Sequence, residues 1–175
     1  RRYKRENHEG GVSAPFIVHW PKGIAAKGAL RHQVAHLIDL MPTFVEVSGA
    51  EYPQTFKGHG VQPMEGQSLM PSFASADLKS RTLFWEHEGN RAVRDGNWKL
   101  VGNRGGPWEL YQIAEDRTEL VNLAGKQPVR LEGLKSKWET WAKRVRVLTP
   151  AQFEAARRAH RKELKKKGAA PSSPE

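Results

Sequence analysis

The sequence contains no cysteine among its 175 residues. Disulfide bonds, thiolate metal sites and a cysteine nucleophile are therefore excluded within this chain. No apolar run approaches the ~18 residues of a membrane-spanning helix, and the first residues show no signal-peptide pattern. Acidic side chains are few: the chain has 19 of them and 29 lysines and arginines, which gives a net charge of +10. These absences favour a basic globular chain with no membrane as partner.

The excess positive charge is concentrated near the C-terminal end. Residues 157–167 hold seven basic residues and one acid, so this stretch supplies +6 of the net charge. A nucleic-acid-binding surface spreads its charge over the fold, whereas a basic tail is more often a solvated arm. We therefore expect residues 149–175 to form a helix and a basic, disordered tail. Polyanion binding by the tail is the alternative, and nucleic acid is not an expected partner.

The first fifty residues predict a strand followed by a helix. Residues 14–20, APFIVHW, form a short apolar run that Pro21 ends, which is typical of a buried strand. Apolar residues then recur at spacings of three and four until Gly49, a C-terminal cap. They are Leu37, Leu40, Phe44 and Val47. A strand followed by a helix is the unit of an α/β layer fold.

The middle of the chain predicts a long connection and then a small sheet. Residues 51–80 are rich in Gly, Pro, Ser and Gln, and we expect a surface connection with one short helix near 68–75. Residues 81–113 contain four short segments of aromatic and branched residues, separated by the turn sequences EGN, DGN and NRGGP. Asp95-Gly96 is a tight-hairpin signal. A four-stranded antiparallel meander is the expected result.

An amphipathic helix is predicted after this sheet. Large apolar residues recur at alternating spacings of three and four through residues 128–148. They are Leu131, Leu134, Trp138, Trp141, Val145 and Leu148. The stripe is shorter than the three or four heptads of a coiled coil, so we expect it to pack on the sheet. Thr149-Pro150 is typical of the start of another helix.

Lys4 is the candidate for a chemical role. The paired glycines Gly10 and Gly11 follow it, and such pairs permit a sharp turn and close backbone approach. A lysine held beside them would suit an oxyanion such as sulfate or phosphate. By composition alone, a lone lysine is more often an ordinary surface residue.

Four blocks of sequence carry a family resemblance. They read YKRENHEGGVSAPFIVHWPKGI, HLIDLMPTFVEVSGA, WEHEGNRAVRDGNWKLV and WELYQIAEDRTELVNLA. In this order, over roughly residues 1–145, they resemble the C-terminal part of the type I sulfatases, the arylsulfatase group of the alkaline-phosphatase superfamily. The resemblance implies an α/β (alkaline-phosphatase-like) remnant plus an α+β C-terminal subdomain.

The resemblance also implies domain boundaries and the roles of particular residues in catalysis. Residues 1–50 would be the edge of the catalytic α/β domain, 51–80 a connecting loop, and 81–148 the C-terminal subdomain. The family lysine that contacts sulfate and the leaving oxygen stands five residues before the Glu of Glu-Gly-Gly, which is Lys4 before Glu9. The family nucleophile is a formylglycine made from Cys or Ser in a Cys/Ser-x-Pro-x-Arg motif, and it acts beside calcium.

Neither the nucleophile motif nor the calcium-binding acidic pairs occur in this sequence, and Ser13-Ala14-Pro15 continues with Phe16-Ile17. We therefore expect a fragment that supplies Lys4, is inactive alone, and has a missing N-terminal catalytic region as its partner. The family resemblance suggests a periplasmic or secreted location and a sulfate-ester small molecule or glycan as substrate.

Several histidines invite a functional interpretation. His8 and His87 are candidate substrate contacts, although each also fits a structural role. His32 and His36 lie four residues apart, but HQVAH lacks the Glu of a zinc motif, so we expect no metal ligand in this chain. Asp39 is expected to cap a helix. Arg94 and Lys99 are expected at the sheet surface or a domain interface.

Three alternatives to a sulfatase fragment stay open. A phosphodiesterase or phosphonate hydrolase of the same superfamily acts on a similar tetrahedral oxyanion. A basic binding module would use the charged tail and the six tryptophans. However, four of the tryptophans (Trp85, Trp98, Trp138 and Trp141) occupy core-type positions. A non-catalytic partner or truncated relic is the third.

Overall fold

The computed structural model describes residues 2–166. Contacts divide the chain into two units, one formed by Arg1–Ala14 with Arg81–Glu175 and the other by Pro15–Ser80. The first fourteen residues thus group with the sheet and not with the rest of the expected 1–50 segment. Among the described residues, no helix combines the length and apolarity that crossing a bilayer requires.

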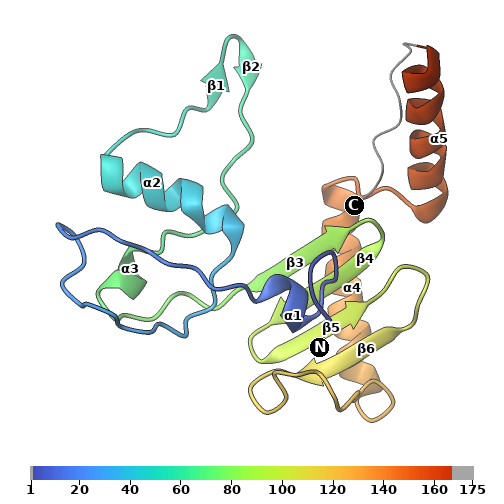
Figure 1. Ribbon diagram of the computed structural model, residues 1–175, viewed down its shortest axis with the longest axis horizontal. Coiled ribbons are helices and arrows are strands. Elements are labelled where there is room, and N and C mark those ends of the chain that lie inside the picture. Colours follow the sequence, from blue (N-terminus) through green and yellow to red (C-terminus); the bar gives the residue numbers. More distant parts are fainter. Residues whose placement is uncertain (1, 167–175) are drawn as a thin grey trace. The chain divides into compact units, whose positions relative to one another are not determined.

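The first unit is built on a four-stranded antiparallel sheet, as the turn pattern predicted (Figure 1). Its strands are β3 (Thr82–His87), β4 (Asn90–Asp95), β5 (Trp98–Gly102) and β6 (Trp108–Gln112). They pair in sequential order, with Asp95 opposite Trp98 at the tight β4–β5 turn. Gly96 has φ 57° in this turn, a value that glycine adopts without steric cost.

Helix α4 (Pro128–Arg144) covers one face of this sheet. Leu134 is 5% exposed and packs with Val93, Leu100 and Leu110. The Trp138 indole Nε1 donates a hydrogen bond of 3.1 Å to the carbonyl oxygen of Trp85. The packing of this amphipathic stripe on the sheet is confirmed, but the helix ends at Arg144, before the predicted end at 148.

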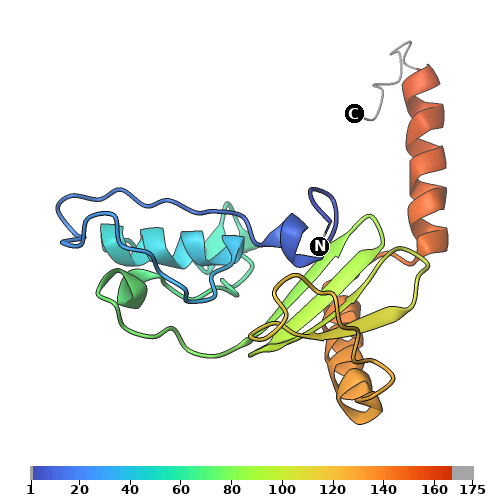
Figure 2. The same cartoon turned by 60° about the horizontal axis from the view of Figure 1, so that its bottom comes forward.

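The opposite face carries a second apolar cluster and the N-terminal segment. Ala92, Val101, Tyr111 and Ile113 are buried there, and Trp85 packs against them. The short helix α1 (Glu9–Val12) lies over this face, on the side away from α4 (Figure 2). Because β4 and β5 are covered on both faces, they carry consecutive apolar residues instead of a strict alternation.

Helix α5 (Pro150–Lys166) begins where the sequence predicted. The Thr149 backbone N–H donates to the Gln152 Oε1 at 2.9 Å, and the Gln152 N–H donates to the Thr149 Oγ1 at 3.3 Å. These reciprocal bonds form a capping box. The helix runs through most of the basic stretch to Lys166, in line with the helix expected there. The disorder expected of the tail stays a prediction. Residues 167–175 lie outside the described residues.

The second unit contains helix α2 (Leu40–Ser48), preceded by the 3-10 turn η1 (Leu37–Asp39). The predicted helix is confirmed, and Gly49 caps it at φ 66°. Helix α3 (Met70–Phe73) is the short helix expected in the connection. The connection also holds a hairpin that was not predicted, formed by β1 (Thr55–Phe56) and β2 (His59–Gly60).

The strand expected over residues 14–20 is wrong. No described strand pairs with this run, and the side chains of Phe16 and Ile17 are 57% and 88% exposed. A strand forms only when a neighbour satisfies its backbone donors and acceptors. The apolar composition of the run therefore does not suffice to make it a strand in this chain.

Leu134 offers a test of the sheet–helix packing. Leu134→Ala should lower the free energy of unfolding of the sheet unit by about 2–5 kcal/mol, because it leaves a cavity beneath α4. Urea titration followed by tryptophan fluorescence reports on this unit, which holds five of the six tryptophans. Val129→Ala on the same helix is the control, since Val129 is 86% exposed and its loss should change stability by no more than about 0.5 kcal/mol. Equal effects of the two changes would contradict the packing.

Candidate functional site

The Lys99 side chain is completely buried between two carboxylates. Its Nζ lies 2.8 Å from the Glu9 Oε1 and 3.0 Å from the Glu119 Oε1. Lys99 is on β5, Glu9 opens α1, and Glu119 lies in the loop after β6. The Glu9 backbone N–H also donates to the Glu119 Oε2 at 2.8 Å. We call Glu9, Lys99 and Glu119 the carboxylate clamp. Lys99 was expected at a surface or interface, and the surface alternative is wrong.

The loop of Asp116–Val121 presents Glu119 to Lys99. Glu119 has φ 56°, a left-handed conformation that is unfavourable for a residue with a Cβ. Asp116 compensates, because its carboxylate accepts the N–H groups of Leu120 and Val121 at 2.8 Å each. These bonds lower the pKa of Asp116 from its ordinary value, with the Val121 bond as the largest cause. The loop geometry is thus maintained by an ionised Asp116.

The glycine pair is used for close backbone approach, as its sequence suggested. A Cβ on Gly11 would lie 2.0 Å from the Glu6 carbonyl oxygen and 3.0 Å from that of Tyr3. Any other residue would force the turn that precedes α1 away from it. Gly11 therefore keeps residues 3–6, which include Lys4, folded back against the start of α1.

Lys4 lies on the exposed corner of that turn. The Glu6 N–H donates to the Tyr3 carbonyl at 3.2 Å, closing the turn around Lys4. The next residue, Arg5, is held on the β3–β4 hairpin, where its guanidinium pairs with Glu88 and its carbonyl accepts from the Asn90 Nδ2 at 3.0 Å. The hydrogen bond from Arg5 lowers the pKa of Glu88 from its ordinary value. The Lys4 side chain is exposed, and it makes no ion pair with another residue in the described part of the chain.

His8 is fully buried next to the clamp. Its Nε2 lies 3.1 Å from the Glu109 Oε2, which also accepts from the Tyr111 hydroxyl at 2.8 Å. His87 is exposed at the end of β3, next to Glu88 and thus beside the ion pair that holds Arg5. The structure therefore brings Lys4, His87 and the hairpin to one end of the sheet. The substrate contacts expected of His8 and His87 stay predictions.

The His36 and Asp39 pair belongs to the second unit, where it starts η1. The His36 N–H donates to the Asp39 Oδ2 at 2.7 Å, and the Ile38 N–H donates to the His36 Nδ1 at 3.3 Å. The other Asp39 oxygen accepts from the Gln67 N–H at 3.0 Å, tying the connection to the helix. Asp39 thus serves as part of a capping box. Within residues 2–166, no group of three or more His, Cys, Asp or Glu side chains is placed to hold a metal.

Removing the central charge of the clamp should greatly lower the free energy of unfolding. Lys99→Met should lower the free energy of unfolding by about 3–5 kcal/mol, because it leaves two buried carboxylates facing each other. Adding Glu9→Gln and Glu119→Gln to this variant should restore part of the loss by removing both negative charges. Lys137→Met is the matched control, since its pair with Asp95 is largely exposed and worth at most about 1 kcal/mol. Urea titration of the four proteins gives the comparison, and a Lys99 effect no larger than the control would contradict the clamp.

The Asp116 loop predicts a pH-dependent effect. A carboxylate with a lowered folded pKa contributes stability above its unfolded value, about 3.9, and loses it as the pH falls through the folded value. Asp116→Asn should therefore be less stable than the wild type at neutral pH, and the difference should shrink below about pH 4. Thermal unfolding across this range measures it. Asp77→Asn, at an exposed position in the other unit, is the control. A pH-independent difference would exclude this explanation.

Comparison with known proteins places these features in a family. Residues 2–140 match the family model for the C-terminal part of N-sulphoglucosamine sulphohydrolase. An uncharacterized sulfatase of Schizosaccharomyces pombe is 31% identical over 156 residues, covering 84% of this chain and 28% of the relative. Arylsulfatase K of Xenopus laevis is 26% identical over 77% of this chain and 27% of its own length. An N-acetylglucosamine-6-O-sulfatase of Bacteroides thetaiotaomicron is 28% identical over 70% of this chain and 23% of its own.

The fold is shared with solved sulfatase structures. A structure from work on glycosaminoglycan metabolism by Bacteroides thetaiotaomicron matches with a TM-score of 0.65 at 20% identity, covering 80% of this chain and 31% of that one. The chain thus spans about a quarter to a third of the relatives that it matches. The family model covers the clamp, the Lys4 turn, the four-stranded sheet and α4 up to residue 140, and it leaves α5 outside. The chain belongs to the sulfatase family, and it corresponds to the C-terminal part of those proteins.

Proposed function

We propose that this chain is the C-terminal part of a sulfuric ester hydrolase, and that Lys4 is its contact with the sulfate group. One observation carries the proposal: Lys4 is an exposed cation on a turn that is fixed on both sides. Arg5 is held by Glu88 and Asn90, and the clamp holds Glu9. A side chain presented in this way is free to face an anion while its backbone stays in place.

The chemistry asked of Lys4 is electrostatic. A sulfate ester gains negative charge on the bridging oxygen as the S–O bond breaks. An ammonium group positioned at that oxygen stabilises the transition state more than the ground state, which raises the rate of the chemical step. The exposed side chain leaves the ammonium available for this contact, and the anchored backbone reduces the entropy that must be lost on reaching it.

Calcium has no candidate carboxylate site among residues 2–166. This part of the chain holds no cluster of three or more His, Cys, Asp or Glu side chains placed to hold a metal. In our proposal the calcium ligands and the formylglycine precursor belong to a catalytic region that precedes residue 1 in the whole protein. The chain spans 28% of its fission-yeast relative, which leaves ample length for such a region.

Exposed apolar side chains in the 15–80 unit support a missing neighbour. Leu37 and Phe44 on η1 and α2 are 77% and 63% exposed, and Phe16 and Ile17 lie on the uncovered extended run. Apolar surface of this kind is typical of a face that another part of a protein covers. We infer that it packs against the catalytic region, which would also supply the neighbouring strand that residues 14–20 lack.

The substrate that we propose is a sulfated sugar or glycan. The matching family model and the Bacteroides relative both bear names of glucosamine-type sulfatases. Glucosamine 6-sulfate and the aryl ester p-nitrophenyl sulfate are therefore the two substrates to compare. The second candidate is a phosphodiesterase or phosphonate hydrolase, because Lys4 would also suit a phosphoryl oxyanion.

The test is to express the chain together with the upstream sequence of its own gene. We expect hydrolysis of at least one of the two sulfate esters by the extended protein and none by the 175-residue chain alone. Lys4→Gln in the extended protein should lower kcat by about 10²–10³, the usual cost of losing one such contact. Lys22→Gln, at an exposed position in the other unit, is the matched control.

Two outcomes would overturn the assignment. Unchanged kcat in Lys4→Gln would remove Lys4 from the sulfate site. Faster turnover of a phosphonate monoester or phosphodiester than of either sulfate ester would favour the second candidate. Activity of the 175-residue chain alone would show that the nucleophile lies within it.

A further inference from the structure

Five cationic side chains lie along one side of α5. They are Arg157, Arg158, Arg161, Lys162 and Lys165, and all five are exposed. Positions separated by three or four residues share a side of an α-helix, and one turn rises about 5.4 Å. The side chains therefore form two adjacent rows of positive charge over about two turns. We call these five residues the α5 cationic face.

The two acids of α5, Glu154 and Glu163, neutralise this face only in part. Glu154 is engaged by Arg104 of the β5–β6 loop, and it lies 3.8 Å from Arg157. The Arg104 hydrogen bond is the largest cause that lowers the pKa of Glu154, and Arg157 and Arg158 lower it further. Glu163 is two residues from Arg161, about 200° around the helix, and thus on another side. The face keeps a strong net positive charge.

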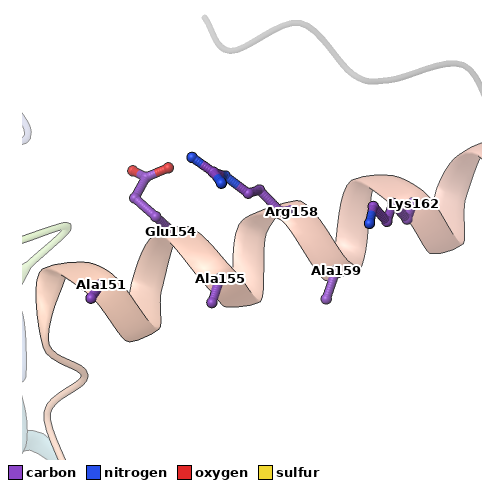
Figure 3. A pocket seen from close by; sticks show the side chains of 6 residues that line it. All are labelled: Ala151, Glu154, Ala155, Arg158, Ala159 and Lys162. Carbon is purple, nitrogen blue, oxygen red and sulfur yellow. The ribbon is translucent and has the colours of Figure 1, made fainter.

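The first turns of α5 are attached to the sheet unit. Besides its pair with Glu154, Arg104 has its guanidinium carbon 5.4 Å from the centre of the Phe153 ring. Figure 3 shows Glu154 and Arg158 pointing to one side of the helix and Ala151, Ala155 and Ala159 pointing to the other. These alanines line a shallow hollow together with Glu154, Arg158 and Lys162, so two cations and one acid border it. A polymer lying in the hollow would meet cations without a steric barrier.

We propose that the α5 cationic face binds a sulfated polysaccharide. The ligand class rests on the proposed function, in which the whole protein acts on sulfated sugars. Guanidinium groups form paired hydrogen bonds with oxyanions, and three of the five cations are arginines. A chain with sulfates at intervals can engage successive turns of the helix together. The face would then retain a polymeric substrate in addition to the contact that Lys4 makes.

A single-stranded nucleic acid is the less suitable polyanion. Its recognition usually combines positive charge with aromatic side chains on which bases stack. The one aromatic residue of α5 is Phe153, and its ring already lies near the guanidinium groups of both Arg104 and Arg157. The exposed groups of the face are charged and aliphatic, which suits a sulfated sugar chain.

The experiment measures binding of the full 175-residue chain to a heparin oligosaccharide across a range of salt concentrations. The test variant changes the five residues of the α5 cationic face to Gln, a good helix former, and leaves the rest of the chain intact. The matched control removes five exposed charges elsewhere. Its substitutions are Lys22→Gln, Lys27→Gln, Lys57→Gln, Arg117→Gln and Lys126→Gln. Circular dichroism of both variants checks that the helices are retained.

We expect the test variant to bind at least about tenfold more weakly with a shallower salt dependence, because fewer counterions are released. The control should bind like the wild type. De-N-, de-O-sulfated heparin and single-stranded DNA of equal length should both bind the wild type more weakly than heparin does. Equal losses in the two variants, or equal affinity for DNA and heparin, would overturn the proposal.

The proposed function and this inference can fail separately. Heparin binding by the 175-residue chain requires no turnover, so an inactive extended protein leaves the binding result unaffected. Conversely, the five α5 substitutions could leave both heparin affinity and hydrolysis of a monosaccharide sulfate unchanged. That result would reject polysaccharide binding by the α5 cationic face and would leave the proposed function intact.

Discussion

The ammonium group of Lys99 is the interaction on which the first unit depends. Burying a charge is costly, and the cost is offset only when partners replace the lost hydration. Here two carboxylates replace it, one from α1 and one from the loop after β6. The sheet is thereby joined to a segment 90 residues earlier in the chain. Other contacts of the N-terminal segment include those at the β3–β4 hairpin and the pair of His8 with Glu109.

The clamp gives the small sheet a role beyond packing. The sheet holds α4 on one face, while its other face holds the turn that bears Lys4. The sheet thereby anchors a segment that lies far away in the sequence. Helix α5 extends the same principle, because its first turns are attached to the β5–β6 loop through Arg104. Both cationic features are therefore carried by one sheet.

Local patterns were sufficient to predict most of the elements. The turn sequences identified the four strands, and the apolar spacing identified α2 and α4. The strand predicted at 14–20 is wrong because apolar composition indicates burial but does not identify a neighbouring strand with which the run could pair. The clamp was missed for a related reason, since a lysine in a strand resembles a surface residue. One signal was available: Lys99 stands between Trp98 and Leu100, so it faces the other side of a sheet whose central strands carry consecutive apolar residues. Its carboxylate partners could not be inferred, because loop geometry and chain reversal brought them there.

The clamp can form only late in the translation of this chain, because its residues are far apart in the sequence. Glu9 leaves the exit tunnel long before its partners exist, because Glu119 follows it by 110 residues. At typical elongation rates of about 5–20 residues per second, the lysine turn stays unanchored for several seconds. During that interval the 15–80 segment is free to fold between two ends that have not yet met. Completion of the Lys4 turn thus coincides with the end of synthesis of the sheet, although the residues of the turn are made more than 110 residues before Glu119.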